Sequence, residues 1–592
     1  MAQLNTLLDE LEQTGLIRIA QIAPELEYLF RHALVQDAAY GTLLKQDKKA
    51  LHRAVAQAIE TTYPDRVEEL AAVLAMHFAL AEDDARALHY YIRAGDEAIA
   101  RYAIAEAIRL YDRAIAIEKR SPDGNFGHPF LQRGRACELI GDYPGALATY
   151  TTLEELARAR GDGSARLAAL IAQATIRATT TTVHDAPEAE RLLGEALALA
   201  RQLGDSAAEA RIEWNLMLYY KFTGHGQEAV RHGEISLKIA REHNLREQMA
   251  FTMNDLVTHG YLDAGDILQA RQMAEEVPKL WAELGNKPML ADSYSSAAIV
   301  YFLLGEYDQA LRIAGEARTV SEAIGNRWGQ SYSRWIVGDI YRDYGELGQA
   351  VETMEQSIEL GEACGFVGAA AGVGSDLAFL LGMLGRLDEA RVRAERAVEA
   401  SEKHLPNWLP WPLAALGWVQ LHSGDLPAAI QTAARIDQVM EHSVASEFAS
   451  SLFPTRMALA EIALANRDIA GAHRSLDVLD NYAERTGMRA YVPDFHLQRG
   501  RTYLAQNEVE AARQSFEKSS AMAEALPSRW IGWQALAALA DLARRDHQTA
   551  AAEDYRQRAL AIIQDIAQRA GRPDLRESFL ALAEVRAVAR RR

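Results

Sequence analysis

The sequence predicts an all-α protein, a right-handed α-solenoid or superhelix built from helix hairpins about 40 residues long. Only 16 prolines occur among its 592 residues, against about 5% in an average protein. A short glycine-containing phrase recurs at a spacing of 40 residues. Between its copies, apolar residues recur every three or four positions, as in amphipathic helices. A single such unit cannot bury its apolar face alone, so stacked neighbours must supply the core.

The recurring phrase is a glycine, a polar residue, an apolar residue, two variable positions and an alanine. Its copies occupy 265–270, 305–310, 345–350 and 385–390, then 141–146, 224–229 and 424–429, with degenerate copies at 467–472 and 507–512. Glycine accepts the left-handed conformation that ends a helix, and a following acid favours the next helix N-terminus. The alanine lets two helix backbones approach closely. The phrase therefore predicts helix hairpins, and the alternative, an irregular helical bundle, would need no fixed period.

The first 83 residues do not carry this period. Residues 4–14 read as an amphipathic helix, and two short apolar runs follow, at 16–19 and 26–30, with Pro24 between them. Short apolar runs on either side of a proline turn predict a β-hairpin. We interpret this hairpin as the wing of a winged-helix module.

The hairpin phrase resembles the tetratricopeptide repeat (TPR), whose usual unit is about 34 residues. The 40-residue form is similar to the repeats of bacterial signal-transduction ATPases of the STAND type and cyclase-linked ATPases. Residues 30–40 and 43–53 resemble the stretch that joins the ATPase module to the repeats in these proteins, and residues 573–580 resemble their ending. The resemblance implies three parts: a partial winged-helix and helical linker module (1–83), about twelve TPR-like hairpins (84–570), and a C-terminal capping helix with a basic tail (571–592).

The sequence departs from this family in one respect that bears on activity. No GxxxxGK[ST] phosphate-binding loop occurs, and the dipeptide Gly-Lys is absent altogether. A phosphate loop needs backbone amides, a lysine and a metal-binding hydroxyl together, so ATP hydrolysis does not carry over. We expect the C-terminal product of a split or truncated gene, with a freestanding descendant as the alternative.

Charge and composition restrict the partners. The formal net charge is −19, from 63 basic and 82 acidic residues, which argues against nucleic acid or an anionic membrane as the main partner. Two cysteines 227 positions apart, Cys137 and Cys364, exclude a cysteine-based zinc site and fit a reducing compartment. No signal peptide or membrane-spanning stretch is present, so we expect a cytoplasmic protein. We also expect no catalytic, cofactor or metal site, because no corresponding motif occurs.

The repeat surface is the remaining candidate for function. The first helix of each hairpin lines the concave groove of a TPR superhelix, and aligning the small residues Ala298, Gly338 and Ala378 sets its phase. The predicted inward-facing, partner-binding side chains are Asn215, Tyr219, Asp255, His259, Asp292, Ser295, Tyr332, Trp335, Asp339, Arg342, Ser375, Phe379, Trp411 and Trp418. A groove with mixed aromatics, acids and amides suits an extended peptide or a partner helix. The alternative for any one residue is a place in the core between repeats.

Three functions follow from these observations. The first is a non-catalytic scaffold or sensor that binds a protein or peptide partner and regulates a bacterial signalling ATPase or cyclase, which can be encoded separately. The second is a fragment of a transcription regulator whose repeats sense an inducer, although the charge weighs against it. The third is a truncated member of an adenylate or guanylate cyclase–ATPase family. The first accounts best for a repeat array without a phosphate loop.

Overall fold

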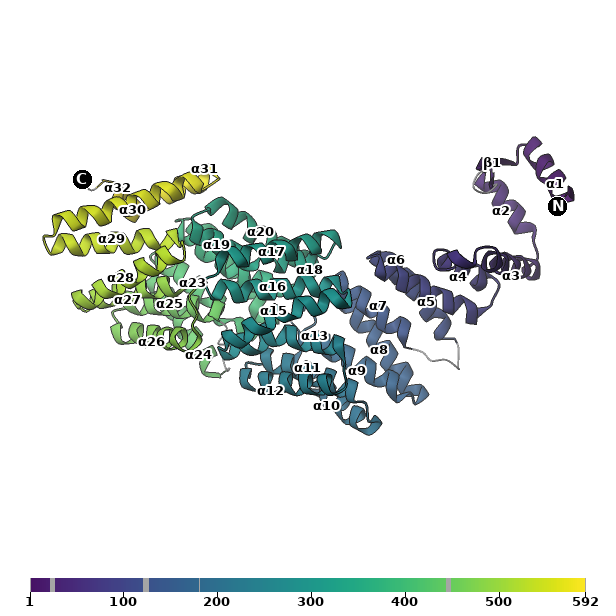
Figure 1. Ribbon diagram of the computed structural model, residues 1–592, viewed down its shortest axis with the longest axis horizontal. Coiled ribbons are helices and arrows are strands. Elements are labelled where there is room, and N and C mark those ends of the chain that lie inside the picture. The colour runs from purple at the N-terminus through teal and green to yellow at the C-terminus, as the bar shows by residue number, and fades with distance from the viewer. Residues whose placement is uncertain (1, 22–26, 121–126, 180, 443–448, 591–592) are drawn as a thin grey trace. The chain divides into compact units, whose positions relative to one another are not determined.

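The computed structural model describes residues 2–21, 27–120, 127–179, 181–442 and 449–590. Within these ranges the chain is helical apart from one pair of strands, and successive helices pack as antiparallel hairpins (Figure 1). The predicted all-α, TPR-like fold is therefore confirmed. The chain forms two compact units, residues 1–132 and 133–592, which we describe separately.

The first unit contains the predicted β-hairpin. Strand β1 pairs antiparallel with β2, with Ile17 opposite Phe30 and Ile19 opposite Tyr28. The turn that contains Pro24 lies outside the described residues. The elements of this unit are α1 (Ala2–Gln13), β1 (Ile17–Gln21), β2 (Glu27–Phe30), α2 (Ala33–Thr42), α3 (Lys45–Thr62), η1 (Pro64–Arg66), α4 (Ala71–Leu80), α5 (Asp84–Ala100), α6 (Ile104–Glu118) and the start of α7 (His128–Leu139).

Basic side chains of α3 contact the end of α4. Lys45 and Lys49 both form ion pairs with Glu82, and Arg53 donates a hydrogen bond to the carbonyl of Ala81 at 3.4 Å. These side chains are therefore engaged within the first unit, where they hold α3 against α4.

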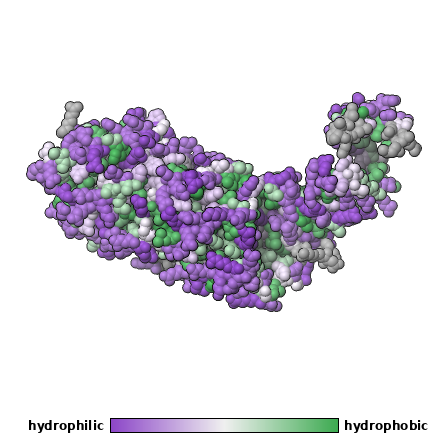
Figure 2. Space-filling model, viewed as in Figure 1, coloured by the Kyte–Doolittle hydropathy of each residue, from purple (hydrophilic) through white to green (hydrophobic). Residues whose placement is uncertain are grey.

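The second unit continues the hairpins. Its helices are α8 (Tyr143–Arg160), α9 (Gly163–Ala178), α10 (Ala186–Leu203), α11 (Ser206–Phe222), α12 (Gly226–Glu242), α13 (Arg246–Asp255), η2 (Leu256–Tyr261), α14 (Leu262–Ala264), α15 (Ile267–Leu284), α16 (Lys287–Leu303), α17 (Tyr307–Ala323), α18 (Arg327–Tyr332), α19 (Trp335–Tyr344), α20 (Leu347–Cys364), η3 (Ala369–Val373), α21 (Gly374–Met383), α22 (Leu387–His404), η4 (Pro406–Trp408), α23 (Pro410–His422), α24 (Leu426–His442), α25 (Ala449–Ala465), α26 (Ile469–Thr486), α27 (Val492–Ala505), α28 (Val509–Ala525), α29 (Arg529–Arg545), α30 (Thr549–Arg569), α31 (Pro573–Ala581) and α32 (Ala583–Arg590). None of the helices in the described ranges combines the length and apolarity needed to cross a membrane. Figure 2 shows hydrophilic side chains over most of the visible face of this unit, with hydrophobic ones gathered in patches.

The glycine phrase caps helices as predicted. Gly265 ends the helix before it in the left-handed conformation, with φ of 76°. Asp266 then caps the next helix by accepting a hydrogen bond from the backbone N–H of Gln269 at 3.1 Å. In the next two copies a glutamate stands in place of the aspartate. Glu306 and Glu346 occupy the N-cap positions, but neither side chain accepts a capping hydrogen bond. The longer side chain instead reaches an arginine, as in the 2.8 Å ion pair between Glu306 and Arg271.

The same phrase also joins segments that are far apart in the sequence. The array of the second unit coils back on itself, so that α19 lies beside α29 and α20 beside α30 and α31. The backbone N–H of Gly348 donates to the carbonyl of Ala570 at 2.9 Å. The hydroxyl of Tyr482 donates to the carbonyl of Leu262, 220 residues earlier, at 3.4 Å. Repeats about five hairpins apart are therefore in direct contact.

We expect Gly345→Ala to destabilise the fold more than Gly285→Ala. Both glycines have a positive φ, of 77° and 71°, so either substitution costs about 1 kcal/mol of backbone strain. A Cβ at Gly345 would also lie 2.6 Å from Cγ1 of Ile566, whereas one at Gly285 meets nothing within 4 Å. The expected extra loss is on the order of 1–2 kcal/mol, measured by urea denaturation. Equal losses for the two variants would contradict a close contact between successive turns.

Candidate functional site

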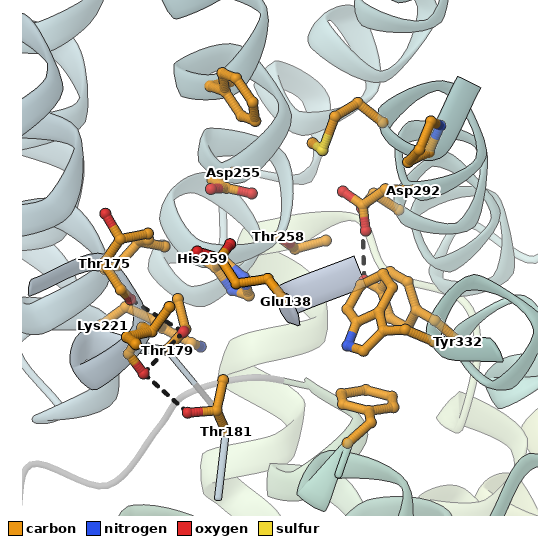
Figure 3. A pocket seen from close by; sticks show the side chains of 18 of the residues that line it. Glu138, Thr175, Thr179, Thr181, Lys221, Asp255, Thr258, His259, Asp292 and Tyr332 are labelled. Carbon is orange, nitrogen blue, oxygen red and sulfur yellow. Dashed lines mark hydrogen bonds between the residues drawn. The ribbon is translucent and has the colours of Figure 1, made fainter. Parts of the chain in front are cut away.

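The helices that open successive hairpins of the second unit surround a cavity of about 310 Å³ (Figure 3). Its lining comes from α7, α8, α9, α11, α13, η2, α16, α18 and α19, together with Phe366 and Trp408. The lining is largely aromatic and aliphatic, with a few charged groups. Cavities of this size and character are typical of small-molecule sites.

Two carboxylates lie at one side of the cavity. Asp255 accepts a hydrogen bond from the indole N–H of Trp214 at 2.8 Å, and Nδ2 of Asn254 donates to Oδ2 of Asp292 at 2.5 Å and to Oδ1 of Asp255 at 3.2 Å. Burial raises the pKa of Asp255 to about 6. Burial and the neighbouring Asp255 raise the pKa of Asp292 to about 7. The two acids therefore titrate close to neutral pH.

A basic group lies at the other side of the cavity. Burial lowers the pKa of Lys221 to about 7. Burial, and then the charge of Lys221, lower the pKa of His259 to about 3, so this imidazole is neutral at pH 7. In Figure 3, Lys221 lies with Thr179 and Thr181 on one side, and Asp292 lies with Tyr332 on the other.

Five aromatic residues form what we call the aromatic wall: Trp328, Tyr332, Trp335, Phe366 and Trp408. The ring of Trp328 lies 5.0 Å from that of Tyr332 and 5.1 Å from that of Phe366, and Trp335 lies 5.8 Å from Trp408. Behind the wall, a Cβ on Gly372 would lie 2.5 Å from the ring of Trp335. The glycine-rich segment 364–375 thus serves close helix packing against this wall.

A π-helical turn places part of the lining. Helix α13 ends at Asp255 and continues as the π turn η2 (Leu256–Tyr261), which carries the lining residues Thr258 and His259. Single π turns inside α-helices are frequent at functional sites. A π turn has more residues per turn than an α-helix, so it shifts the face that the following side chains present.

The cavity brings together five of the fourteen side chains predicted to face inward. These are Asp255, His259, Asp292, Tyr332 and Trp335. Ser295 does not line the cavity; the neighbouring Ser296 does. The hydroxyl of Ser295 instead donates a hydrogen bond to the carbonyl of Ala291 at 3.1 Å. Ser296 stands four positions after Asp292 on α16, so helix periodicity places these two side chains on the same face.

The other predicted side chains lie elsewhere. Asn215 and Ser375 are fully buried within helix packing, and Tyr219 is half-buried beside Tyr220. Asp339 and Arg342 form a buried ion pair away from the cavity. Phe379, Trp411 and Trp418 pack in the hydrophobic core. Partner binding by the fourteen predicted side chains as a group stays a prediction.

Several lining residues were not predicted from the sequence. Trp328 and Trp408 stand 80 positions apart, which is two repeat lengths, so the period could have paired them. Lys221 is a basic residue within the otherwise apolar end of α11. Because lysine is rarely buried, its position in this pattern could have indicated a functional site. Among the described residues, no three His, Cys, Asp or Glu side chains converge to hold a metal ion.

Residues 290–324, which cover most of α16 and all of α17, match the family model described as tetratricopeptide repeat. The comparison with curated proteins found no match. The chain is thus a TPR-like helical-repeat protein, and repeats of this type commonly serve as protein interaction modules.

Three solved structures are similar in fold at low sequence identity. A Rap protein complexed with competence and sporulation factor is 11% identical, with a TM-score of 0.42, and the match covers 61% of this chain and 99% of that one. The Cut9–Hcn1 hetero-tetramer of the APC/C is 13% identical, with a TM-score of 0.48, covering 94% and 98%. A STAND protein with a tetratricopeptide repeat sensor from Pyrococcus horikoshii is 15% identical, with a TM-score of 0.36, covering 73% and 57%.

Proposed function

We propose that this chain is a non-catalytic sensor or scaffold module of a bacterial signalling system, which regulates an ATPase or cyclase by binding a protein or peptide partner. The observation that carries the proposal is the convergence of successive hairpins on one cavity. A ligand that contacts several hairpins at once couples their relative positions. Its binding therefore favours one curvature of the array over others.

A second observation supports a protein partner. The described N-terminal residues expose large apolar side chains, among them Leu34 at 81% and Leu44 at 72%. Leu29 and Phe30 on β2 and Leu51 on α3 are exposed as well. These exposed apolar side chains are concentrated in residues 29–51, and we propose that this stretch contributes to a surface for a partner.

The proposal predicts that a partner depends on the cavity. With the full chain as bait, we expect the wild type to retain one specific partner from a lysate of its source cells. Trp328→Ala removes a half-buried ring of the aromatic wall, and we expect it to lower that recovery at least fivefold. Leu268→Ala, at a side chain 70% exposed on α15, is the control and should leave recovery unchanged.

Two results would count against this function. One is equal recovery of every captured protein by wild type and Trp328→Ala while circular dichroism shows both folded. The other is saturable binding of Mg-ATP to the purified chain in a calorimetric titration, because a non-catalytic module without a phosphate loop has no site for it.

A further inference from the structure

We infer that the cavity of the second unit is a receptor site for a small organic cation, an ammonium group carried on an apolar body. This inference rests on the proposed function in one respect, since it names the effector to which such a sensor would respond. Three features of the cavity support a cationic ligand: the carboxylate pair, the aromatic wall and the separation of the nearby basic groups from both.

The carboxylate pair lacks a cation. Asn254 bridges Asp255 and Asp292, and the indole of Trp214 completes the hydrogen bonds of Asp255. Within the described ranges, no lysine, arginine or histidine forms an ion pair with either carboxylate. Two adjacent, partly buried carboxylates without a counter-ion are costly to keep charged. A ligand cation would remove that cost, whereas an anion would increase it.

The basic groups of the cavity do not fill this role. Lys221 perturbs the titration of His259, but it is not among the groups that shift the pKa of Asp255 or Asp292. The His259 imidazole is neutral at pH 7. On the far side, Arg135 lies 3.8 Å from the carboxylate of Glu138, which also accepts a hydrogen bond from Tyr150 at 2.5 Å.

The aromatic wall completes the site. Tyr332 belongs to this wall and also lies close enough to the acids that Asp292 raises the pKa of its phenol, after burial as the larger cause. Its hydroxyl is 3.5 Å from that of Ser296, which also lines the cavity. Aromatic faces attract ammonium groups through their electron-rich π systems, most strongly where water is excluded. The apolar body of the ligand would pack against the remaining rings of the wall.

The titration of the two acids couples binding to pH. With pKa values of about 6 and about 7, the acids hold protons at pH 5.5 and have largely lost them at pH 8. A cation binds the deprotonated pair more tightly, so its affinity rises through this range and binding near pH 6.5 releases protons. Lys221 loses its own positive charge over the same range, which acts in the same direction.

The test uses the full chain and three phenyl probes of similar size: phenethylammonium, neutral 2-phenylethanol and anionic 3-phenylpropionate. Isothermal titration calorimetry is run at pH 5.5 and pH 8, and at pH 6.5 in two buffers of different ionisation enthalpy. Asp292→Asn removes one carboxylate of the pair. Glu276→Gln removes an equal charge at an exposed position of α15 and is the matched control.

We expect phenethylammonium to bind at pH 8 at least tenfold more tightly than 2-phenylethanol, and 3-phenylpropionate to bind weakest. Asp292→Asn should reduce phenethylammonium affinity at least tenfold and reduce proton release to the part that Asp255 supplies, whereas Glu276→Gln should change neither. Equal affinity for the cationic and neutral probes, or full affinity in Asp292→Asn, would overturn the inference. The absence of saturable phenethylammonium binding at millimolar concentration would do so too.

These titrations need no partner protein, so they separate the two proposals. Failure of the cation to bind leaves the partner-capture experiment as an independent test of the sensor function. Conversely, cation binding without capture of a partner would support the cation site and contradict the proposed signalling role.

Discussion

Replacing Arg342 by methionine is expected to cost about 3–5 kcal/mol of folding free energy, the usual range when one partner of a buried ion pair is removed. Arg342 pairs with Oδ1 of Asp339 at 3.3 Å and with Oδ1 of Asp343 at 2.9 Å, and its side chain is only 11% exposed. Urea denaturation at pH 8 measures the loss. Because the array is long, the midpoint and slope should be recorded by both fluorescence and circular dichroism.

The cost is large because Arg342 is surrounded by acids from distant parts of the chain. Arg342 has two ion-pair partners on α19. It also interacts electrostatically with Asp376 on α21 and Asp494 on α27. Burial and the neighbouring Asp343 raise the pKa of Asp494 to about 7, although Arg342 opposes that shift. Removing Arg342 from among these four acids leaves their mutual repulsion without the positive charge that opposes it.

The matched control is Arg386→Met. Arg386 also links distant segments, through a 2.8 Å ion pair with Asp574, but the partner side chain is 48% exposed. Exposed pairs contribute about 0.2–1 kcal/mol. The loss in Arg342→Met should also shrink at pH 5, because burial raises the pKa values of Asp339, Asp376 and Asp494 and these carboxyls are then largely protonated. A loss of under 1 kcal/mol at pH 8 would contradict this account of the cluster.

The sequence predicts the repeating part of this fold well, because its period reflects local physics. A left-handed glycine and a helix-capping aspartate act within a few residues, so Gly265 and Asp266 can be interpreted without a structure. The β-hairpin of the first unit follows equally from alternating local signals. Contacts between turns are different. Nothing around Gly345 in the sequence indicates that Ile566 will pack against it.

The site is predicted only in part, for a related reason. Asp255, Asp292 and Tyr332 are placed on the inner side by the period alone. The π turn at Leu256–Tyr261 has no counterpart in the repeat phrase. On α16 the period identifies Asp292 but selects Ser295, whereas Ser296, four positions after Asp292, lines the cavity. Arg342 and Asp339 share the same helical side as the cavity residue Trp335, but Arg342 interacts electrostatically with Asp494 of α27, more than 140 positions away. Burial by a distant segment, rather than local pattern, decides which charged residues face a cavity and which form a cluster.

Asp292→Asn is expected to stabilise the protein at pH 8 while it removes the cation site. In the folded chain the pKa of Asp292 is about 7, above the unfolded value of about 3.9. Between these values the folded state binds more protons than the unfolded state, so the free energy of unfolding falls as pH rises through this window. Asparagine carries no charge to bury and can still accept the hydrogen bond from Asn254. The expected gain is on the order of 2 kcal/mol at pH 8, after allowance for the access that the cavity gives to solvent.

The pH dependence distinguishes this explanation from better packing. At pH 5 the folded carboxyl is protonated and the pH is only about one unit above the unfolded pKa of about 3.9. The gain in Asp292→Asn should therefore shrink to about a third of its size at pH 8. The exposed control Glu276→Gln should stay within about 0.5 kcal/mol of wild type at both pH values. A gain of equal size at pH 5 and pH 8 would show that ionisation is not its cause. A gain that grows from pH 5 to pH 8 would mean that the chain keeps a destabilising carboxylate in its cavity, as binding sites do when function opposes stability.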